Sequence, residues 1–305
     1  DASPLSSSTP PSSLKDHSNM TPNDKSIWDR AYLNEYLGLT EDTNTWEYIS
    51  EREYQILRPI TGNALPSMAI STIKKDADGL PIRAKYRIVV LGNLDPHTWT
   101  KQDCFAPVMS QLEFRSMIAS AVRLQRTPKS GDFQNAFCQS TLPKNEQYII
   151  RPPINCPLTP PRTYLRLLKT LYGLKRSPRH WFELASKIFK DIGLSPCPNA
   201  PCLFTGFIDD SGSRIYVGLY VDDFIYFGDT PEVEDKFRSL MTDSTLVTFE
   251  NDPTLFLGIK ITKKSLPQNQ FSIHLSQKVI IQNLMIEHDL PSSSITKVTP
   301  YRSGY

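Results

Sequence analysis

Two adjacent carboxylates interrupt an otherwise apolar segment of the chain. Asp222 and Asp223 lie within residues 216–227, where nearly every other side chain suits a buried strand. Because a buried charge must be paired or must bind a metal, we expect a cation at this point. The simplest backbone for the pair is a tight hairpin with both acids at or beside its turn, since Asp tolerates turn conformations. The alternative is an ordinary turn at the surface.

A third carboxylate, Asp132, precedes Asp222 by ninety residues and lies on a predicted short strand. An antiparallel sheet could bring the three acids together, although their spacing alone also allows that they never meet. Neighbouring strand residues face opposite sides, so at most one of Asp222 and Asp223 points squarely into a shared site. Carboxylate oxygens suit Mg²⁺, and two such ions would form a clamp for in-line phosphoryl transfer.

The segments that precede Asp132 predict a helix and a hairpin. Apolar spacing indicates a helix from about Lys25 to Leu37 that ends at Gly38 in a left-handed cap. Residues 67–73 and 83–91 are the predicted strands of a β-hairpin around the turn 76–79. The second strand of this hairpin carries two cations on one face.

The remaining predicted elements surround the acids. In chain order they are a helix at 111–124, the short strand of Asp132, a helix at 177–192, a helix from 231 to about 241, and short strands at 245–249 and 256–261, which end the regular part. In the helix at 177–192, Ser177 is the predicted N-cap, Pro178 lies in the first turn, and the helix stops at Gly193.

The composition indicates a soluble globular protein. With 305 residues and 39% hydrophobic content, the chain can bury a sizeable core as one large or two closely packed units. No apolar run approaches the roughly 18 residues of a membrane span, and the N-terminus lacks the apolar core of a signal peptide. The five cysteines form no CxxC pair, so they indicate neither a zinc site nor a disulfide framework. Because the chain begins at Asp1 rather than Met, we expect it to be cut from a longer protein.

The net charge of +2 is unevenly distributed along the chain. Residues 1–50 carry eight acids and three bases, whereas residues 151–190 carry nine bases and the single acid Glu183. Bases interleaved with aromatic residues indicate a surface that contacts nucleic-acid phosphates. The alternative for this basic segment is a solvated helix face.

The segment Tyr220-Val221-Asp222-Asp223 resembles the catalytic hairpin of reverse transcriptases. Six further blocks are similar to the copia-type LTR retrotransposon branch, in the order expected there, and the resemblance extends from about Trp28 to the C-terminus. The blocks are 85–89 (KYRIV), 105–108 (FAPV), 132–137 (DFQNAF), 171–181 (LYGLKRSPRHW), 201–204 (PCLF) and 256–259 (FLGI). The chain therefore resembles the RNA-directed DNA polymerase domain of a Pol polyprotein.

The resemblance implies an α+β fold of the right-hand polymerase class, with an antiparallel palm sheet packed on helices. Fingers and palm would be present and the thumb only begun. The implied divisions are a disordered Ser- and Pro-rich leader at 1–24, fingers at 25–130 and 140–170, palm at 131–139 and 171–262, and the start of a thumb or connection at 263–305.

The resemblance also implies a role for each matching residue. Asp132, Asp222 and Asp223 would be catalytic and, with Phe133, would hold two Mg²⁺ ions, for which Mn²⁺ could substitute. Asp222 would contact both ions. The nucleotide-binding residues would be Lys85, Arg87, Asn135, Ala136, Phe137, Tyr172 and Gly173. The template- and primer-binding residues would be Lys175, Arg176, Arg179, Tyr220, Val221, Phe256, Leu257 and Gly258.

Some of these roles have a physical rationale and an open alternative. Lys85 and Arg87, on one strand face, would clamp the triphosphate. Phe137 would be a steric gate that fills the space of a ribose 2′ hydroxyl, and the alternative is a plain core residue. Gly173 would let the backbone approach the nucleotide closely. Residues 256–259 would form a primer grip, with an ordinary edge strand as the alternative.

The implied partners are dNTPs, an RNA or DNA template, a DNA or tRNA-type primer, and the integrase and RNase H segments of a parent polyprotein. No membrane partner is expected, and the implied location is intracellular, in the cytoplasm or in virus-like particles. Two other functions stay open: a decayed copy that binds nucleic acid without polymerising, and an RNA-dependent RNA polymerase, against which Phe137 argues. No Lys or His lies between Phe237 and Ile259, so the general acid for pyrophosphate stays unassigned.

Overall fold

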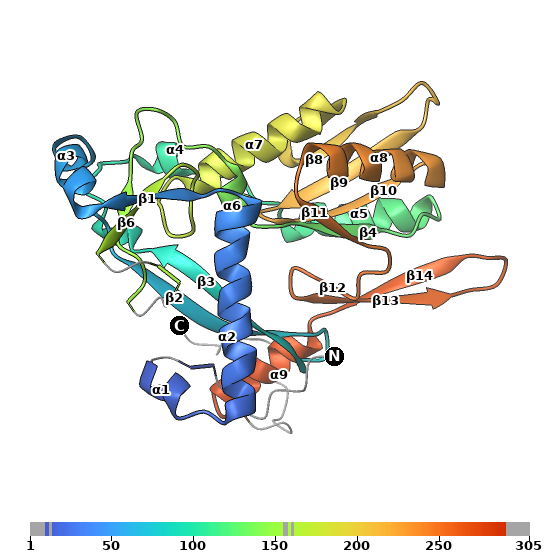
Figure 1. The fold of residues 1–305 in the computed structure, drawn as a ribbon. Coiled ribbons are helices and arrows are strands. Elements are labelled where there is room, and N and C mark those ends of the chain that lie inside the picture. Colours follow the sequence, from blue (N-terminus) through green and yellow to red (C-terminus); the bar gives the residue numbers. More distant parts are fainter. Residues whose placement is uncertain (1–9, 12–13, 155–157, 160–161, 291–305) are drawn as a thin grey trace, which may run out of the picture. The chain divides into compact units, whose positions relative to one another are not determined.

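The computed structural model describes residues 10–11, 14–154, 158–159 and 162–290 (Figure 1). The described chain forms two compact units. The first runs to Lys74 and from Pro81 to Pro253, and the second combines Lys75–Leu80 with the residues from Thr254 onward. The implied boundary between palm and thumb, at residues 262 and 263, stays a prediction, because compactness divides the chain after Pro253.

The described chain combines helices with sheets of antiparallel strands, which confirms the predicted α+β class. The helices are α1 (Leu14–Ser18), α2 (Pro22–Leu37), α3 (Glu51–Thr61), α4 (Lys101–Cys104), α5 (Gln111–Arg123), α6 (Ala136–Gln139), α7 (Ser177–Asp191), α8 (Pro231–Ser244) and α9 (Lys278–Glu287), with a π-helical turn at Gly38–Asp42 and a 3₁₀ turn at Gly92–Leu94. The strands are β1 (Trp46–Ser50), β2 (Ser67–Lys75), β3 (Pro81–Val90), β4 (Lys129–Phe133), β5 (Ile149–Ile150), β6 (Thr163–Leu167), β7 (Leu194–Cys197), β8 (Ala200–Phe207), β9 (Arg214–Tyr220), β10 (Asp223–Gly228), β11 (Val247–Glu250), β12 (Leu255–Phe256), β13 (Ile259–Ser265) and β14 (Phe271–Ser276). Within the described ranges, no helix combines the length and the apolar character that a bilayer span needs.

Part of the predicted disordered leader is helical. Helix α1 lies inside it, and α2 begins at Pro22, ahead of the predicted start at Lys25. Thr21 caps α2, because its Oγ1 accepts the Asp24 N–H at 3.2 Å. The prediction of disorder is therefore wrong for these residues, while 1–9 and 12–13 lie outside the described residues.

Gly38 does not end α2 in the left-handed cap that was predicted. Its φ is −57°, and the chain continues there as a π-helical turn. Gly38 nevertheless holds the C-cap position of α2. A Cβ at Gly38 would lie 2.6 Å from Nδ2 of Asn135, so the side chain of Asn135 would have to move to admit a larger residue.

The predicted hairpin of β2 and β3 is confirmed. At its turn, the Asp76 carboxylate accepts the N–H groups of Asp78 at 2.9 Å and of Leu80 at 2.8 Å. Gly79 supplies the left-handed conformation that this turn needs, with φ +84°.

The first unit contains a six-stranded antiparallel sheet with the order β11-β4-β10-β9-β8-β7 (Figure 1). Phe133 of β4 and Phe224 of β10 point to the face covered by α7 and α8, where Trp181, Phe189 and Phe237 complete the core. Because strand residues alternate between the two faces, the residues next to these phenylalanines point away from this core.

Helix α7 confirms the predicted helix but not its predicted cap. Ser177 is the first helical residue, and Arg176 holds the N-cap position. The Ser177 hydroxyl instead donates to the Leu171 carbonyl at 2.7 Å. This bond ties the start of α7 to the preceding segment, and Gly193 follows the helix with φ +98°.

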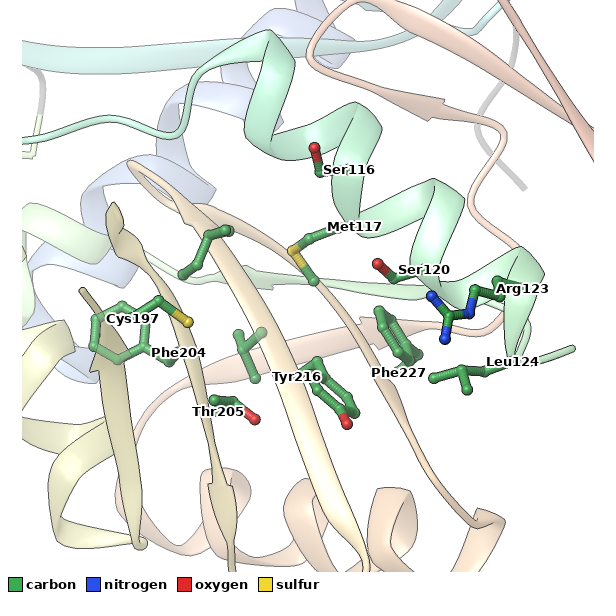
Figure 2. A pocket seen from close by; sticks show the side chains of 12 residues that line it. Ser116, Met117, Ser120, Arg123, Leu124, Cys197, Phe204, Thr205, Tyr216 and Phe227 are labelled. Atoms are coloured by element: carbon green, nitrogen blue, oxygen red, sulfur yellow. The ribbon is translucent and has the colours of Figure 1, made fainter. Parts of the chain in front are cut away.

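Helix α5 lies against the other face of the sheet. A reciprocal capping box begins it, in which Glu113 accepts the Ser110 N–H at 2.6 Å and Ser110 accepts the Glu113 N–H at 3.2 Å. Figure 2 shows the pocket of about 400 Å³ between α5 and the strands, which Met117 and Tyr216 help to line. Gly218 allows this close approach, since a Cβ there would lie 2.5 Å from the Met117 sulfur.

A second core joins the hairpin strand β3 to the segment that precedes α7. Ile88 and Val90 of β3 pack with Leu171 and Leu174, and all four are buried. The small sheet β1-β6-β5 contributes to the same core through Leu165. This core fixes β3 beside residues 171–174.

The second unit contains regular structure that was not predicted. A two-residue turn at Leu257 and Gly258 joins β12 to β13, and β13 pairs along its length with β14. Helix α9 follows β14. The prediction that regular structure ends near residue 261 is therefore wrong.

We expect Gly131→Ala to lower the free energy of unfolding by about 1–3 kcal/mol, the usual cost of overpacking a core. A Cβ at Gly131 would lie 2.2 Å from Cζ of Phe224, within the helix-covered core. Denaturant unfolding measures the loss. Phe224→Leu in the same background makes room for the new methyl group, so the double variant should lose less than the sum of the single losses. Strictly additive losses would show that this contact is not the cause.

Candidate active site

Two of the three acids, Asp132 and Asp223, meet across neighbouring strands. Asp132 of β4 lies directly opposite Asp223 of β10 in the sheet register. Both occupy the face that points away from Phe133 and Phe224 and their core. The two carboxyl groups are hydrogen-bonded to each other. The predicted convergence of distant acids on one side of a sheet is therefore what the structure has.

Asp222 lies in the turn of the predicted hairpin. Tyr220 pairs with Asp223, which leaves Val221 and Asp222 as a two-residue loop between β9 and β10. The Asp222 carbonyl accepts the Phe133 N–H at 2.8 Å, so the turn is bonded to the strand that carries Asp132. This backbone bond holds the third acid beside the other two.

Val221 adopts a backbone conformation that is rare for a β-branched residue. Its φ is +55°, in the left-handed region. Such strain persists only where surrounding contacts fix it, and it is common at functional sites. Here the Trp181 indole N–H donates to the Val221 carbonyl at 2.5 Å, and Trp181 itself is buried. Helix α7 thereby holds the turn.

Burial and the charges of neighbouring acids raise the pKa values of Asp132 and Asp223. Burial and then the charge of Asp222 raise the pKa of Asp132, and the neighbouring cations Lys74 and Lys85 oppose this shift. Burial and then the charges of Asp222 and Asp132 raise the pKa of Asp223 to about 7. Carboxylates this close cannot all ionise without a compensating cation. In its absence, a proton stays in the cluster near neutral pH.

The donor set fits a divalent cation, although the acids are not arranged as a finished cage. Over the part of the chain that the structure describes, no three His, Cys, Asp or Glu side chains stand in a metal-holding arrangement. Asp132 and Asp223 bond to each other instead. Hard carboxylate oxygens with raised pKa values are nevertheless groups that Mg²⁺ would stabilise in the ionised state. Phe133 has a buried side chain and could contribute only its carbonyl oxygen.

Two cations, Lys74 and Lys85, act electrostatically on the acids, and Arg87 lies on the same strand as Lys85. Lys85 and Arg87 lie on β3 as predicted, and burial followed by the charges of Arg87 and Lys74 lowers the pKa of Lys85. Lys74, an exposed residue of β2, acts electrostatically on both Asp132 and Asp223. Sequence reasoning missed Lys74. Its place near the end of the first strand of a predicted hairpin was the available signal, because the paired strand carries the other two cations.

Tyr172 links two residues predicted to bind the nucleotide. The Arg87 guanidinium lies 5.6 Å from the centre of its ring, and the Phe137 ring packs edge-on at 4.9 Å. Phe137 is half-buried and also packs against the main core, so it has features of both the gate and the core alternatives. Asn135, with φ +49°, and the buried Ala136 begin the short helix α6.

A contact that was not predicted explains why residue 173 is a glycine. Its φ is +93°, and a Cβ there would lie 2.0 Å from the Val90 carbonyl oxygen. The Val90 N–H also donates to the Tyr172 carbonyl at 2.8 Å. The close approach that requires glycine is therefore to the end of β3, whereas an approach to a nucleotide stays a prediction.

The predicted template-binding cations make contacts within the chain. Lys175 donates to the Asp95 carbonyl at 3.1 Å, and Arg176 forms an ion pair with the buried Glu146. The Arg176 guanidinium also lies 4.8 Å from the Trp99 ring centre. Arg176 is thus part of an internal network, which argues against its predicted exposure to a template.

The helix-face alternative describes part of the basic segment better than a continuous phosphate surface does. Arg179 pairs with Glu183 at 2.5 Å, one turn along α7, and Lys187 pairs with Asp191 at 2.5 Å in the same way. Such exposed pairs are typical of a solvated helix.

An apolar groove borders the acid-bearing turn. Its volume is about 290 Å³, and its lining includes Val221, Leu219 and Trp181 on one side and Phe105 and Val108 on the other. Phe105 and Val108 are exposed although they are large and apolar. Sequence reasoning noted their block as part of the resemblance but assigned these two residues no role.

The predicted primer-binding residues 256–258 lie in the second unit. Phe256 is buried, and Leu257 and Gly258 form the turn between β12 and β13 with φ values of +52° and +70°. Two successive positive φ values are typical of a type I′ hairpin turn. The alternative of an edge strand holds for Phe256, because β12 is the edge strand of its sheet, whereas 257–258 form a turn; primer contact stays a prediction.

Comparisons with known proteins identify similar sequences. The family described as "Reverse transcriptase (RNA-dependent DNA polymerase)" matches residues 52–302. The "Retrovirus-related Pol polyprotein from transposon RE1" of Arabidopsis thaliana is 29% identical over 216 residues, which cover 71% of this chain and 14% of that protein. The corresponding polyprotein from transposon RE2 is 30% identical over 209 residues, 68% of this chain and 14% of that protein. The chain therefore spans only a small part of these relatives.

Among solved structures, a foamy viral protease-reverse transcriptase in complex with double-stranded DNA is similar with a TM-score of 0.44 and 14% identity. The match covers 93% of this chain and 51% of that one. The family match, rather than this structural likeness, confirms the resemblance found in the sequence.

In the metal-free protein, we expect the free energy of unfolding to fall as pH rises from about 5 to 8. The folded pKa of Asp223, about 7, lies above the unfolded value of about 3.9, so the folded state binds more protons in this window. Stability is therefore greatest at low pH and is lost as pH rises through 7. Denaturant unfolding across this range measures the slope, and Asp223→Asn should flatten it.

Mg²⁺ should stabilise the parent protein more at pH 8 than at pH 5, because it competes with the shared proton. Stability that increases with pH in the metal-free parent, or a slope that Asp223→Asn leaves unchanged, would contradict this account.

Proposed function

The chain belongs to the reverse transcriptase (RNA-dependent DNA polymerase) family, and from this premise we propose that it extends a nucleic-acid primer with deoxynucleotides. The reaction would take place at the strand ends and turn that carry Asp132, Asp222 and Asp223. One observation carries the proposal. Asp132 and Asp223 stand directly opposite each other, and Asp222 lies in a turn bonded to Phe133, the neighbour of Asp132.

The proposed cofactors are two Mg²⁺ ions, with Mn²⁺ as a substitute, held by the three aspartates and the Phe133 carbonyl. When bound, such ions activate a primer 3′ hydroxyl and neutralise the charge of departing pyrophosphate. The aspartates themselves must release their shared proton before they can bind cations fully, because the raised pKa of Asp223 keeps that proton in place near neutrality. Asp222, in the turn, is the proposed contact to both ions.

The incoming dNTP would face the cations beside these acids. Lys85 and Arg87, joined by Lys74, would contact its triphosphate, since charge-assisted bonds to phosphate are strong. Tyr172 supports the Arg87 guanidinium from below. Phe137, packed on Tyr172, would contact the sugar at the position of a 2′ hydroxyl. Asn135, Ala136 and Gly173 would contribute backbone contacts.

The template and primer would lie beside the acid-bearing turn. Tyr220 and Val221 flank the acids, and the apolar groove next to Val221 offers a surface for the sugar and base edges of a paired strand. Lys175 and Arg179 would meet phosphates. Arg176 is left out, because Glu146 binds it.

The remaining parts of the proposal concern whole-length relatives. A primer contact at 256–258, an RNA template, a tRNA-type primer and other Pol segments as partners follow the resemblance to transposon Pol polyproteins. The acids, the strained turn and its bonds are all in place among the described residues, which argues against a decayed copy.

Asp222→Asn and Asp132→Asn should each reduce primer extension by roughly 10³-fold, the order of loss when charge stabilisation is removed from a transition state. Extension of a primed RNA template with Mg²⁺ and dNTPs is the measurement. Asp210→Asn, an exposed acid in a surface turn, is the matched control and should extend normally. Template binding should change little in all three variants. A parent chain that binds template without extending it would support the decayed copy instead.

Phe137→Ala should raise ribonucleotide incorporation relative to dNTP incorporation by about ten-fold or more, because the ring fills the space of a 2′ hydroxyl. Competition between the two nucleotides in single-nucleotide extension measures the ratio. Phe249→Ala is the control, since Phe249 is also partly buried and packs against the same core. Both variants should lose stability, but only Phe137→Ala should lose sugar selection. Equal selection in both would make Phe137 a core residue.

A further inference from the structure

A buried carboxylate lies behind the cations of β3. Glu35, near the end of α2, is only 9% exposed. Its Oε1 accepts the N–H of Ile88 at 3.0 Å. Lys85 and Arg87 are the charged groups of β3 that act on it electrostatically. The activity proposed for this chain assigns Glu35 no role, and a buried acid needs one because burial of a charge is costly.

The hydrogen bond from the Ile88 N–H to Glu35 fixes the backbone of β3 next to Arg87. Strand β3 pairs with β2 in a two-stranded sheet, so one of its edges must find partners outside the sheet. Glu35 supplies such a partner at Ile88, the residue that follows Arg87. An acceptor at this point restricts the backbone from which Arg87 projects.

The charge of Glu35 opposes repulsion among the cations. Burial lowers the pKa of Lys85, the charges of Arg87 and Lys74 lower it further, and Glu35 and Asp132 oppose these effects. Conversely, Lys85 and Arg87 oppose the rise that burial causes in the pKa of Glu35. The acid and the cations therefore stabilise one another in their charged states.

Two other titratable neighbours of Glu35 are not positively charged. Its charge acts on Cys138 of α6 and on Tyr172, and it raises the pKa of both. These groups are neutral near pH 7, because burial already keeps their pKa values high. The cations of β3 are therefore the groups that compensate Glu35.

We propose that Glu35 is a positioning residue, whose carboxylate anchors β3 and whose charge holds Lys85 and Arg87 in place for a polyphosphate group. The inference deepens the proposed function and rests on it for the identity of the ligand, a nucleoside triphosphate. Glu35 does not itself touch that ligand. Preorganised cations bind an anion more strongly than cations that must first be brought together against their repulsion.

Glu35→Gln separates the charge from the anchor. The amide oxygen can still accept the Ile88 N–H, so the variant should fold, whereas the compensating charge is gone. We expect KM for dNTP to rise about three- to ten-fold with kcat nearly unchanged, the pattern of lost ground-state binding. Glu35→Asp keeps the charge on a shorter side chain and should recover part of the loss. Glu41→Gln, at an exposed acid just after the same helix, changes the net charge equally and should behave as the parent.

Binding of inorganic tripolyphosphate in Mg²⁺-free buffer, measured by calorimetry, tests the inference without catalysis. Weaker binding by Glu35→Gln than by the parent and Glu41→Gln supports it, even where the parent extends no primer and the proposed function fails. Equal binding would reduce Glu35 to a backbone anchor and overturn the inference. Tighter binding would also overturn it, because Glu35 would then act only as an unfavourable charge near an anion site. If Glu35→Gln does not fold, Glu35→Asp is compared with the parent: weaker tripolyphosphate binding is expected, because the shorter side chain weakens the anchor and moves the charge, and binding equal to that of the parent would overturn the inference.

Discussion

The repulsion among three carboxylates at the adjoining ends of β4 and β10 is the constraint on which the rest of the first unit depends. Burial raises the pKa of Asp223, and the charges of Asp222 and Asp132 raise it further, so keeping these acids together in the ionised state is costly. The register of β4 and β10 prevents separation. A slip of one residue would move Asp132 to the opposite face and expose the Phe133 side chain, so the aromatic core on that face specifies the arrangement of the acids.

The same core stabilises the strained turn. The left-handed backbone conformation of Val221 is unfavourable for this residue. It is held because the Val221 carbonyl accepts the Trp181 indole N–H and the Asp222 carbonyl accepts the Phe133 N–H. Both bonding partners are buried residues of the core. Hydrophobic packing on one face of the sheet therefore determines the geometry of charged groups on the other. This separation lets the acids change protonation state without disturbing the residues that hold them.

Features with local causes could be predicted from the sequence. The hairpin around Asp222 follows from two acids within an apolar run, and α5 follows from its apolar spacing and capping residues. Features with distant causes could not. The glycine at 173 is required by the backbone of Val90, and the glycine at 38 lies against the side chain of Asn135, so neither contact is visible in the neighbouring residues.

Charged residues obey the same division. Arg179 and Lys187 each pair with an acid one turn further along the same helix, so these pairs could be anticipated from the sequence. Arg176 instead binds Glu146, thirty residues earlier in the chain. A basic residue within a basic segment looks available to a template until its partner is known. The sequence therefore predicts which residue types gather near the acids better than it predicts which of them are free to bind.

Charges of opposite sign neighbour one another around the candidate site. Glu35 interacts with Lys85 and Arg87, and Lys85 in turn interacts with Asp132. Each group is only partly compensated by the next, because burial and then the charges of Arg87 and Lys74 lower the pKa of Lys85, while burial and then the charges of Asp222 and Asp132 raise that of Asp223. A ligand that carries both cations and phosphates would complete both groups at once. The free protein is therefore electrostatically suited to a metal–polyphosphate complex more than to either component alone, because each component would compensate only one of the two charge excesses.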